Sequence, residues 1–240
     1  MSKRNPGAAA PADERLARDD EEGTTLGERV RVILSERLIA GEYSPGSKLS
    51  LRKLADTLGV SMTPVREAIN RLVADRAVEV TPNRAVRVPT MTVSQFRELT
   101  QLRIDIEGMA AFRAAGLRND ADIPEMEVLE AAFREEGRKK KPDLAKVVAA
   151  NQRLHFAIYR ATRSSMLVEI ISGLWLKAGP ILNLDMRSSP ERLASSHALG
   201  LHAAAVEAIA RRDGEAARAA IAADIHNASE FIIARKVLPE

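Results

Sequence analysis

The sequence predicts a mainly α-helical protein with two parts, an N-terminal winged helix-turn-helix and a C-terminal all-α bundle of six or seven helices. Two short amphipathic helices follow one another closely in residues 50–74, with a glycine between them. Alternating apolar residues then flank a Pro-Asn turn in residues 78–88, which is typical of a β-hairpin. From residue 90 onward, apolar residues recur at helical spacing and no convincing strand is present.

Composition narrows the classes of protein. The chain has 240 residues, enough for one or two domains, and 45% of them are hydrophobic but only 3% aromatic, so its cores must be aliphatic. The formal net charge of +3 is compatible with nucleic-acid binding. The absence of cysteine excludes disulfides and thiolate metal sites, and it fits the reducing cytoplasm. No uninterrupted apolar run approaches the ~20 residues that span a bilayer, so we expect no membrane partner.

The N-terminal part is expected to contain a tail and then a DNA-binding domain. Residues 1–23 lack apolar periodicity, which predicts a disordered tail. The domain is expected over residues 24–89. Its first helix should begin at Thr25, with Glu28 completing a capping box, and should end near Gly41.

Capping signals define the two helices of the helix-turn-helix. Ser50 lies where an N-cap belongs, before apolar residues at helical spacing, and Gly59 is placed to end that helix. Thr63 followed by Pro64 predicts an N-cap with proline at the first helical position of the second helix.

The exposed side of the second helix carries arginines and short polar side chains. A small helical subdomain with an ordinary solvated surface would account for this pattern, and so would a DNA-binding face. Arginine, asparagine, serine and threonine are the side chains that contact phosphates and base edges, which favours DNA. The candidate DNA-contacting residues are Arg52, Ser61, Thr63, Arg66, Asn70 and, in the hairpin, Arg84.

Residues 90–240 are expected to form the helical bundle. Asn-Asp, Lys-Pro, Ser-Pro and Asp-Gly breaks divide this part into helices, and short connections favour antiparallel packing. A proline within the fourth of these helices predicts a kink. The expected helices are 92–117, 121–139, 142–162, 165–185, 190–212 and 214–236.

Four polar residues fall within the apolar stripes of three of these helices. Asn151 and His155 are four residues apart and therefore share a face, while His202 and Asp224 occupy the stripes of two later helices. Burying polar groups without partners is costly, so these residues must contact one another or something else. A hydrogen-bonded network and a divalent metal site, for Zn, Mn or Ni, both fit this pattern.

The motifs of the first part resemble the winged-helix domain of GntR-type transcriptional regulators. The resemblance rests mainly on residues 58–61, 63–68 and 82–84. Two positions depart from the family pattern. Met62 replaces an arginine that usually contacts a base, and Ala85 replaces a glycine at the wing tip. The resemblance therefore implies a double-stranded DNA operator whose sequence differs from the usual one.

The second part resembles the FCD effector-binding domain of the FadR-like branch of that family. Members commonly bind a divalent metal through Asp-x-x-x-His on one helix and a histidine on each of two later helices. Here Asn151 and His155 match the first pair, His202 matches the next ligand, and Asp224 takes the last position. The resemblance implies a metal site in which one carboxylate is kept but relocated.

Arg103 has two interpretations. Its spacing from Glu107 allows a surface salt bridge between consecutive turns. The family resemblance implies instead that its guanidinium helps to hold the carboxylate of an effector, a bidentate task that arginine suits.

These features predict a ligand-responsive, cytoplasmic, homodimeric transcriptional regulator and no enzymatic activity. It would bind a palindromic operator and a small carboxylate effector. A metal-dependent enzyme built on the bundle is the main alternative, but no general base is placed beside the candidate ligands and no His-Glu-x-x-His motif is present. A regulator that binds its effector without metal is a further alternative.

Overall fold

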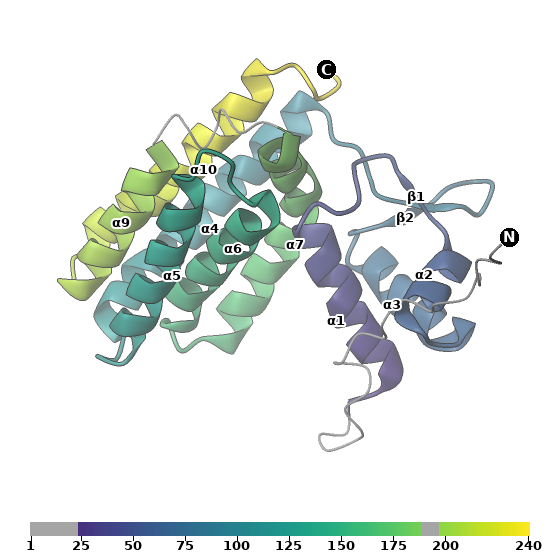
Figure 1. The fold of residues 1–240 in the computed structure, drawn as a ribbon, viewed down its shortest axis with the longest axis horizontal. Helices are drawn as coiled ribbons and strands as arrows, with labels where there is room; N and C mark the ends of the chain where they lie inside the picture. The colour runs from purple at the N-terminus through teal and green to yellow at the C-terminus, as the bar shows by residue number, and fades with distance from the viewer. Residues whose placement is uncertain (1–23, 189–196) are drawn as a thin grey trace, which may run out of the picture. The chain divides into compact units, whose positions relative to one another are not determined.

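The computed structural model describes residues 24–188 and 197–240 (Figure 1). The tail predicted for residues 1–23 lies outside this range. Contacts divide the chain into two compact units. Among the described residues, one unit contains those up to Leu38 together with Tyr43–Thr90, and the other contains Ile39–Glu42 together with those from Met91 onward.

The N-terminal unit has three helices and a small sheet. The sheet order is β1-β3-β2 and both pairings are antiparallel, with Val80 opposite Val86 in the hairpin. The predicted hairpin is therefore confirmed. The sequence did not indicate β1, which is only two residues long and pairs with the far side of the hairpin. The elements are α1 (Leu26–Ile39), β1 (Lys48–Leu49), α2 (Leu51–Leu58), α3 (Met62–Ala74), β2 (Glu79–Val80) and β3 (Val86–Arg87).

Both predicted caps of α2 are present. The Ser50 hydroxyl accepts a hydrogen bond from the Lys53 amide at 3.3 Å. Gly59 ends the helix with a φ of 68°, a left-handed conformation that glycine adopts without steric cost. Local sequence thus determines where this helix begins and ends.

The predicted start of α3 is wrong by two residues. The helix begins at Met62, and Ser61 occupies the N-cap position without a side-chain cap hydrogen bond. Thr63 is therefore not the N-cap, and Pro64 is the third helical residue. Proline is tolerated there because the first four amide groups of a helix have no intrahelical acceptor in any case.

The C-terminal unit is entirely helical within its described residues. Every predicted helix is present, with ends that shift by a few residues. α7 continues through Pro180, and the predicted start of the next helix at Pro190 lies outside the described residues. The helices are α4 (Val93–Leu117), α5 (Asp122–Gly137), α6 (Leu144–Arg160), α7 (Ser165–Ser188), α9 (His197–Ala210) and α10 (Gly214–Ala234).

α4 is the central helix of this unit. It packs most extensively against α10 and also contacts α6, α7 and α9 (Figure 1). Small side chains allow α4 and α10 to approach closely, which explains why an aliphatic, aromatic-poor sequence suffices for the core. The buried alanines of the two helices are Ala110, Ala111, Ala114, Ala115, Ala217, Ala220 and Ala228.

α7 is also the one described helix that meets a length and hydropathy test for a membrane span. The segment Ser165–Asn183 has a mean hydropathy of 1.4, and half of it is buried inside the unit. A core helix of a folded bundle meets the same test, so this composition does not distinguish the two cases.

Candidate nucleic-acid interface and metal centre

The exposed side of α3 carries polar residues that are available for contact. Val65, Ala68 and Leu72 are buried on its inner side. Thr63, Arg66 and Asn70 recur at spacings of three and four residues on the outer side, so they share one face. The structure leaves all six predicted DNA-contacting residues exposed: Arg52, Ser61, Thr63, Arg66, Asn70 and Arg84.

Two other polar residues of α3 contact α1 instead. The Arg71 guanidinium donates to the carboxylate of Glu28, which also accepts from Arg31 at 2.9 Å. Hydrogen bonds from Arg31 and the charges of both arginines lower the pKa of Glu28, although burial opposes this effect. A Cβ at Gly27 would collide with the Glu67 carboxylate, so Glu67 also lies against α1. One part of the outer surface of α3, with Glu67 and Arg71, therefore contacts α1, and the part with Thr63, Arg66 and Asn70 remains exposed.

Arg84 is at the tip of the hairpin in a left-handed conformation. Its φ is 60°, and its amide donates to the Thr81 carbonyl at 2.8 Å to close the turn. A non-glycine residue in this region is strained by about 1–2 kcal/mol. The strained turn leaves the Arg84 side chain exposed at the tip of the hairpin.

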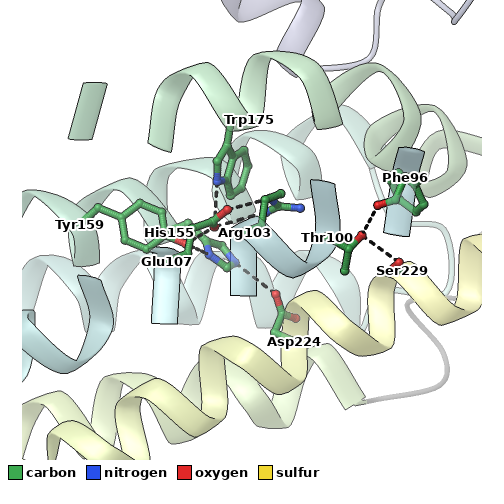
Figure 2. Close-up of polar contacts among 9 residues, drawn as sticks. All are labelled: Phe96, Thr100, Arg103, Glu107, His155, Tyr159, Trp175, Asp224 and Ser229. Carbon is green, nitrogen blue, oxygen red and sulfur yellow. Dashed lines mark hydrogen bonds and ion pairs between the residues drawn. The ribbon is translucent and has the colours of Figure 1, made fainter. Parts of the chain in front are cut away.

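Three of the four predicted metal ligands meet in the interior of the helical unit. Figure 2 shows two of them, His155 and Asp224. His155 Nε2 on α6 lies 3.1 Å from His202 Nε2 on α9. On α10, Asp224 Oδ2 is 3.3 Å from His155 Nε2 and Asp224 Oδ1 is 3.5 Å from His202 Nε2. Both imidazoles are buried, and the Asp224 side chain is only 12% exposed. The fourth, Asn151, is half-buried and lines the same pocket.

The spacing of these ligand atoms fits a tetrahedral cation. In a zinc site with bonds of about 2.0–2.1 Å, neighbouring ligand atoms lie roughly 3.3 Å apart. The three distances above lie within 0.2 Å of that value, but the two carboxylate distances involve different oxygens of Asp224. With one ligand atom taken from each residue, all three atoms lie within 4.8 Å of one another, which is compact enough for these side chains to share a cation.

Tyr159 fixes the tautomer of His155. The Tyr159 hydroxyl donates its one hydrogen to Glu107 Oε2 at 2.5 Å, so it accepts from His155 Nδ1 at 2.8 Å. His155 then carries its proton on Nδ1, and the Nε2 lone pair faces His202 and Asp224. Orienting partners of this kind are typical of histidines that bind metals.

Hydrogen bonds within the protein alone leave this cluster poorly satisfied. With His155 protonated on Nδ1, only His202 has an N–H to offer to the remaining Nε2 and carboxylate atoms. His202 Nδ1 is buried and has no hydrogen-bond partner within the described residues. A lone pair of His155 then faces the Asp224 carboxylate, an arrangement that a cation stabilises. The donor set therefore fits a divalent metal.

The protonation states agree with this assignment. Burial lowers the pKa of His155 more than Asp224 raises it. Burial opposes ionisation of Asp224, but the neighbouring His202 and His155 outweigh it, so the pKa of Asp224 is well below its ordinary value. Burial and the neighbouring Glu107 raise the pKa of Tyr159 well above its ordinary value. A neutral imidazole and an ionised carboxylate are the forms that bind metal.

Arg103 forms a buried salt bridge, where the sequence allowed a surface one. Its Nε donates to Glu107 Oε1 at 2.6 Å and its Nη2 to Oε2 at 3.3 Å, with both side chains inaccessible to solvent or nearly so. Trp175 Nε1 also donates to Glu107, at 2.9 Å. Burial opposes the charge on Arg103, but Glu107 outweighs it and raises the pKa of Arg103. Glu107 thus links Arg103 to Tyr159 and so to His155.

A small pocket connects these groups. Its volume is about 20 Å³, which is enough for one water molecule or one cation. Arg103 uses only part of its five-donor guanidinium on Glu107, so further N–H groups remain for a ligand. The pocket is lined by Arg103, Asn151, His155, Trp175, Leu182, Asn183, Asp224, Ile225 and Ala228.

Comparisons with known proteins agree with these two parts. Residues 26–88 match the gntR family of bacterial regulatory proteins, and residues 98–227 match the FCD domain. This chain is a GntR-family regulator with an FCD domain. The GntR match includes the helix-turn-helix and the hairpin, and the FCD match includes all four predicted metal ligands.

Several relatives of this GntR regulator span most of its length. HTH-type transcriptional regulator McbR of Escherichia coli strain K12 is 33% identical over 150 residues, which cover 62% of this chain and 67% of that protein. The solved structure of E. coli McbR/YncC has a TM-score of 0.81 at 28% identity and covers 89% of this chain and 99% of its own. Uncharacterized regulator BphR of Paraburkholderia xenovorans strain LB400 is 28% identical over 205 residues, covering 82% of this chain and 83% of that protein. The chain is therefore a DNA-binding transcription regulator and not an enzyme.

Sequence reasoning missed two residues of the FCD site. Tyr159 lies four residues after His155, and its position on the same face of α6 was a usable signal. Trp175 is the only tryptophan of the chain, but no sequence pattern connects it with Glu107, 68 positions away. Its role depends on how α4 and α7 pack.

Proposed function

We propose that this GntR regulator acts in the cytoplasm as a homodimer that binds a palindromic operator and responds to a small carboxylate effector held beside one divalent cation, Zn, Mn or Ni. The observation that carries the proposal is the convergence of His155, His202 and Asp224 at the spacing of metal ligands, next to Arg103. The proposed units are a DNA-binding domain at residues 24–89 and an effector domain at residues 90–240.

The cation would be held by His155, His202 and Asp224, with the Asn151 amide oxygen as a weaker fourth ligand. When bound, it supplies a positive centre and an open coordination position. The charges of Arg103 and Glu107 cancel, so a divalent cation and the Asp224 carboxylate leave a net charge of +1 in the pocket. This charge favours an anion, and the free N–H groups of Arg103 suit a carboxylate.

The size of the pocket limits what the effector can do without rearrangement. A volume of about 20 Å³ holds a cation but not a carboxylic acid as well. Binding of the effector therefore requires side chains around the pocket to move. Since Arg103, Trp175 and Tyr159 share Glu107, movement of one disturbs the others. This coupling gives the effector a route to change the helical unit and, through it, DNA affinity.

On the DNA side, we propose that Thr63, Arg66 and Asn70 enter the major groove while Arg84 contacts phosphate or the minor groove. Arg66 is the best placed to read a base, because it is exposed on the free face of α3 and has no hydrogen bond or ion pair within the described part of the chain. Two symmetric half-sites need two recognition helices, which is the reason for a homodimer.

Replacing Arg66 by alanine should weaken operator binding by about 1–3 kcal/mol if the guanidinium reads a base edge. Fluorescence anisotropy with DNA from the regulator's own upstream region measures this change. Arg138→Ala is the matched control, since Arg138 is an exposed arginine at the end of α5. Equal affinity of wild type and Arg66→Ala would rule out this placement. Affinity of all three proteins should fall steeply with salt, because phosphate contacts release counterions.

A further inference from the structure

Exposed apolar side chains of the FCD domain are concentrated on two helices. Most of the large hydrophobic residues that are exposed in its described part belong to α4 or α7. Those on α4 are Leu102, Met109, Phe112 and Leu117, and those on α7 are Met166 and Ile170. Only Val128 and Val237 lie elsewhere in that part. Exposed apolar side chains that are grouped on adjacent helices indicate an interaction surface, whereas single exposed apolar residues scattered over a surface do not.

On α4, the apolar residues form one stripe. Leu102, Ile106 and Met109 follow one another at spacings of four and three residues, so they share a side of the helix. Ile106 is half-buried, and the other two are 45% and 37% exposed. The opposite side of the helix faces the core, where Thr100, Glu107 and Ala111 are buried.

The exposed residues of α7 border the same stripe. Leu174 and Ile181 of α7 pack in one cluster with Phe96 and Leu99 of α4. Ile170 is one turn before Leu174 and therefore lies on the side of α7 that faces α4. Met166 continues this line by a further turn. The stripe of α4 and the exposed edge of α7 thus form one surface, the α4–α7 face, defined by Leu102, Ile106, Met109, Met166 and Ile170.

We propose that the α4–α7 face is where a second copy of this chain docks, with the two α4 helices antiparallel across a two-fold axis near Met109. The inference rests on the proposed homodimer and specifies its surface. A two-fold interface uses the same patch on both copies, so it must be complementary to itself. The charges on α4 meet that condition.

Asp105 and Arg113 lie four residues before and after Met109. In an antiparallel pair of α4 helices that cross at Met109, Asp105 of each copy faces Arg113 of the other. Arg113 is exposed and has no hydrogen bond or ion pair within the described residues, so it is free to pair. Asp105 is exposed and accepts one hydrogen bond, from Gln101 at 3.0 Å. These residues form an i±4 ridge, the kind that interdigitates in the commonest class of helix packing.

Gly116 provides space for the apolar residue opposite it. Leu102 and Gly116 lie seven residues before and after Met109, so each Leu102 falls over Gly116 of the second copy. A Cβ placed on Gly116 would meet no atom within 4 Å, which shows that the surface above it is open. The exposed leucine and the open glycine are therefore complementary about the same axis as the charges.

Charge reversal tests the proposed axis. Light scattering coupled to size-exclusion chromatography of the full chain at micromolar concentration should give wild type a mass of about twice 26.2 kDa. Asp105→Arg and Arg113→Asp each place like charges opposite one another twice, and each should shift the mass toward 26.2 kDa. The double variant restores both pairs with reversed polarity and should recover the dimer. Circular dichroism checks that the variants remain helical.

A control and a second variant make the result decisive. Val128→Glu adds a charge at an exposed apolar site on α5 and should leave the dimer intact, whereas Met109→Glu should break it. A dimeric wild type with dimeric Met109→Glu and Asp105→Arg variants would overturn the α4–α7 face and leave the homodimer standing. A monomeric wild type, with and without DNA, would overturn the homodimer itself. Failure of the double variant to recover the dimer would reject the antiparallel axis at Met109.

Discussion

Replacement of Glu107 by glutamine is expected to lower the free energy of unfolding by about 3–5 kcal/mol. Removing one partner of a buried ion pair leaves the other charge without compensation, which is far more costly than losing a surface pair. Glu107 is fully buried and accepts hydrogen bonds from Arg103, Tyr159 and Trp175. Glutamine has nearly the same shape, so the change isolates the charge and the acceptor. Urea denaturation measures the effect as a lower midpoint with an unchanged m value.

Glu230→Gln is the matched control for this experiment. Glu230 on α10 pairs with Arg97 on α4 at 3.2 Å, but both side chains are about half exposed. Exposed pairs contribute about 0–1 kcal/mol, so this variant should be close to wild type. If Glu107→Gln cost no more than Glu230→Gln, the charge network around Arg103 would not be a structural element of the domain.

Addition of zinc, manganese or nickel to metal-free protein should raise its melting temperature. A ligand that binds only the folded state stabilises it by about 2.7 kcal/mol at a concentration of 100 times Kd. His202→Ala removes a ligand whose Nε2 is 3.1 Å from that of His155, so it should abolish the rise. Asn151→Asp should enlarge the rise, because a carboxylate is a stronger ligand than an amide. Differential scanning fluorimetry with each metal measures these shifts.

His226→Ala is the matched control for the histidine variant. His226 is on α10, two residues after Asp224, but it is exposed and points away from the cluster. It should keep the full thermal shift. A wild type that shows no shift with any of the three metals would leave the hydrogen-bonded network as the explanation of these buried side chains, and a shift that survives His202→Ala would place the metal elsewhere.

Much of the fold could be predicted because it depends on local sequence. Ser50 and Gly59 set the limits of α2, and the periodic apolar residues beyond position 90 gave every helix of the FCD domain. The start of α3 could not be predicted in the same way. Proline is acceptable at any of the first helical positions, so Thr63-Pro64 did not specify the N-cap.

The candidate metal ligands could be predicted from the sequence, but the way in which their neighbours contact them could not. Asn151, His155, His202 and Asp224 stood out because polar residues interrupt apolar stripes. In the structure Asn151, His155 and Asp224 line one pocket, and His202 contacts His155 beside it. Partners contributed by other helices gave no such signal. The sequence allowed a salt bridge between Arg103 and Glu107, but whether it is buried depends on how α4 packs against its neighbours. Long-range packing is what sequence periodicity does not encode.

The direct measurement of the proposed metal centre is anomalous diffraction at the zinc edge, from crystals of the wild-type chain prepared with zinc. We expect one anomalous peak per FCD domain, about 2.0–2.1 Å from Nε2 of His155 and Nε2 of His202 and at a similar distance from the Asp224 carboxylate. The two Nε2 atoms should remain close to their present separation of 3.1 Å. If crystals grown in an excess of zinc give an anomalous map without a peak between these three side chains, the result would contradict the proposed metal centre of this regulator.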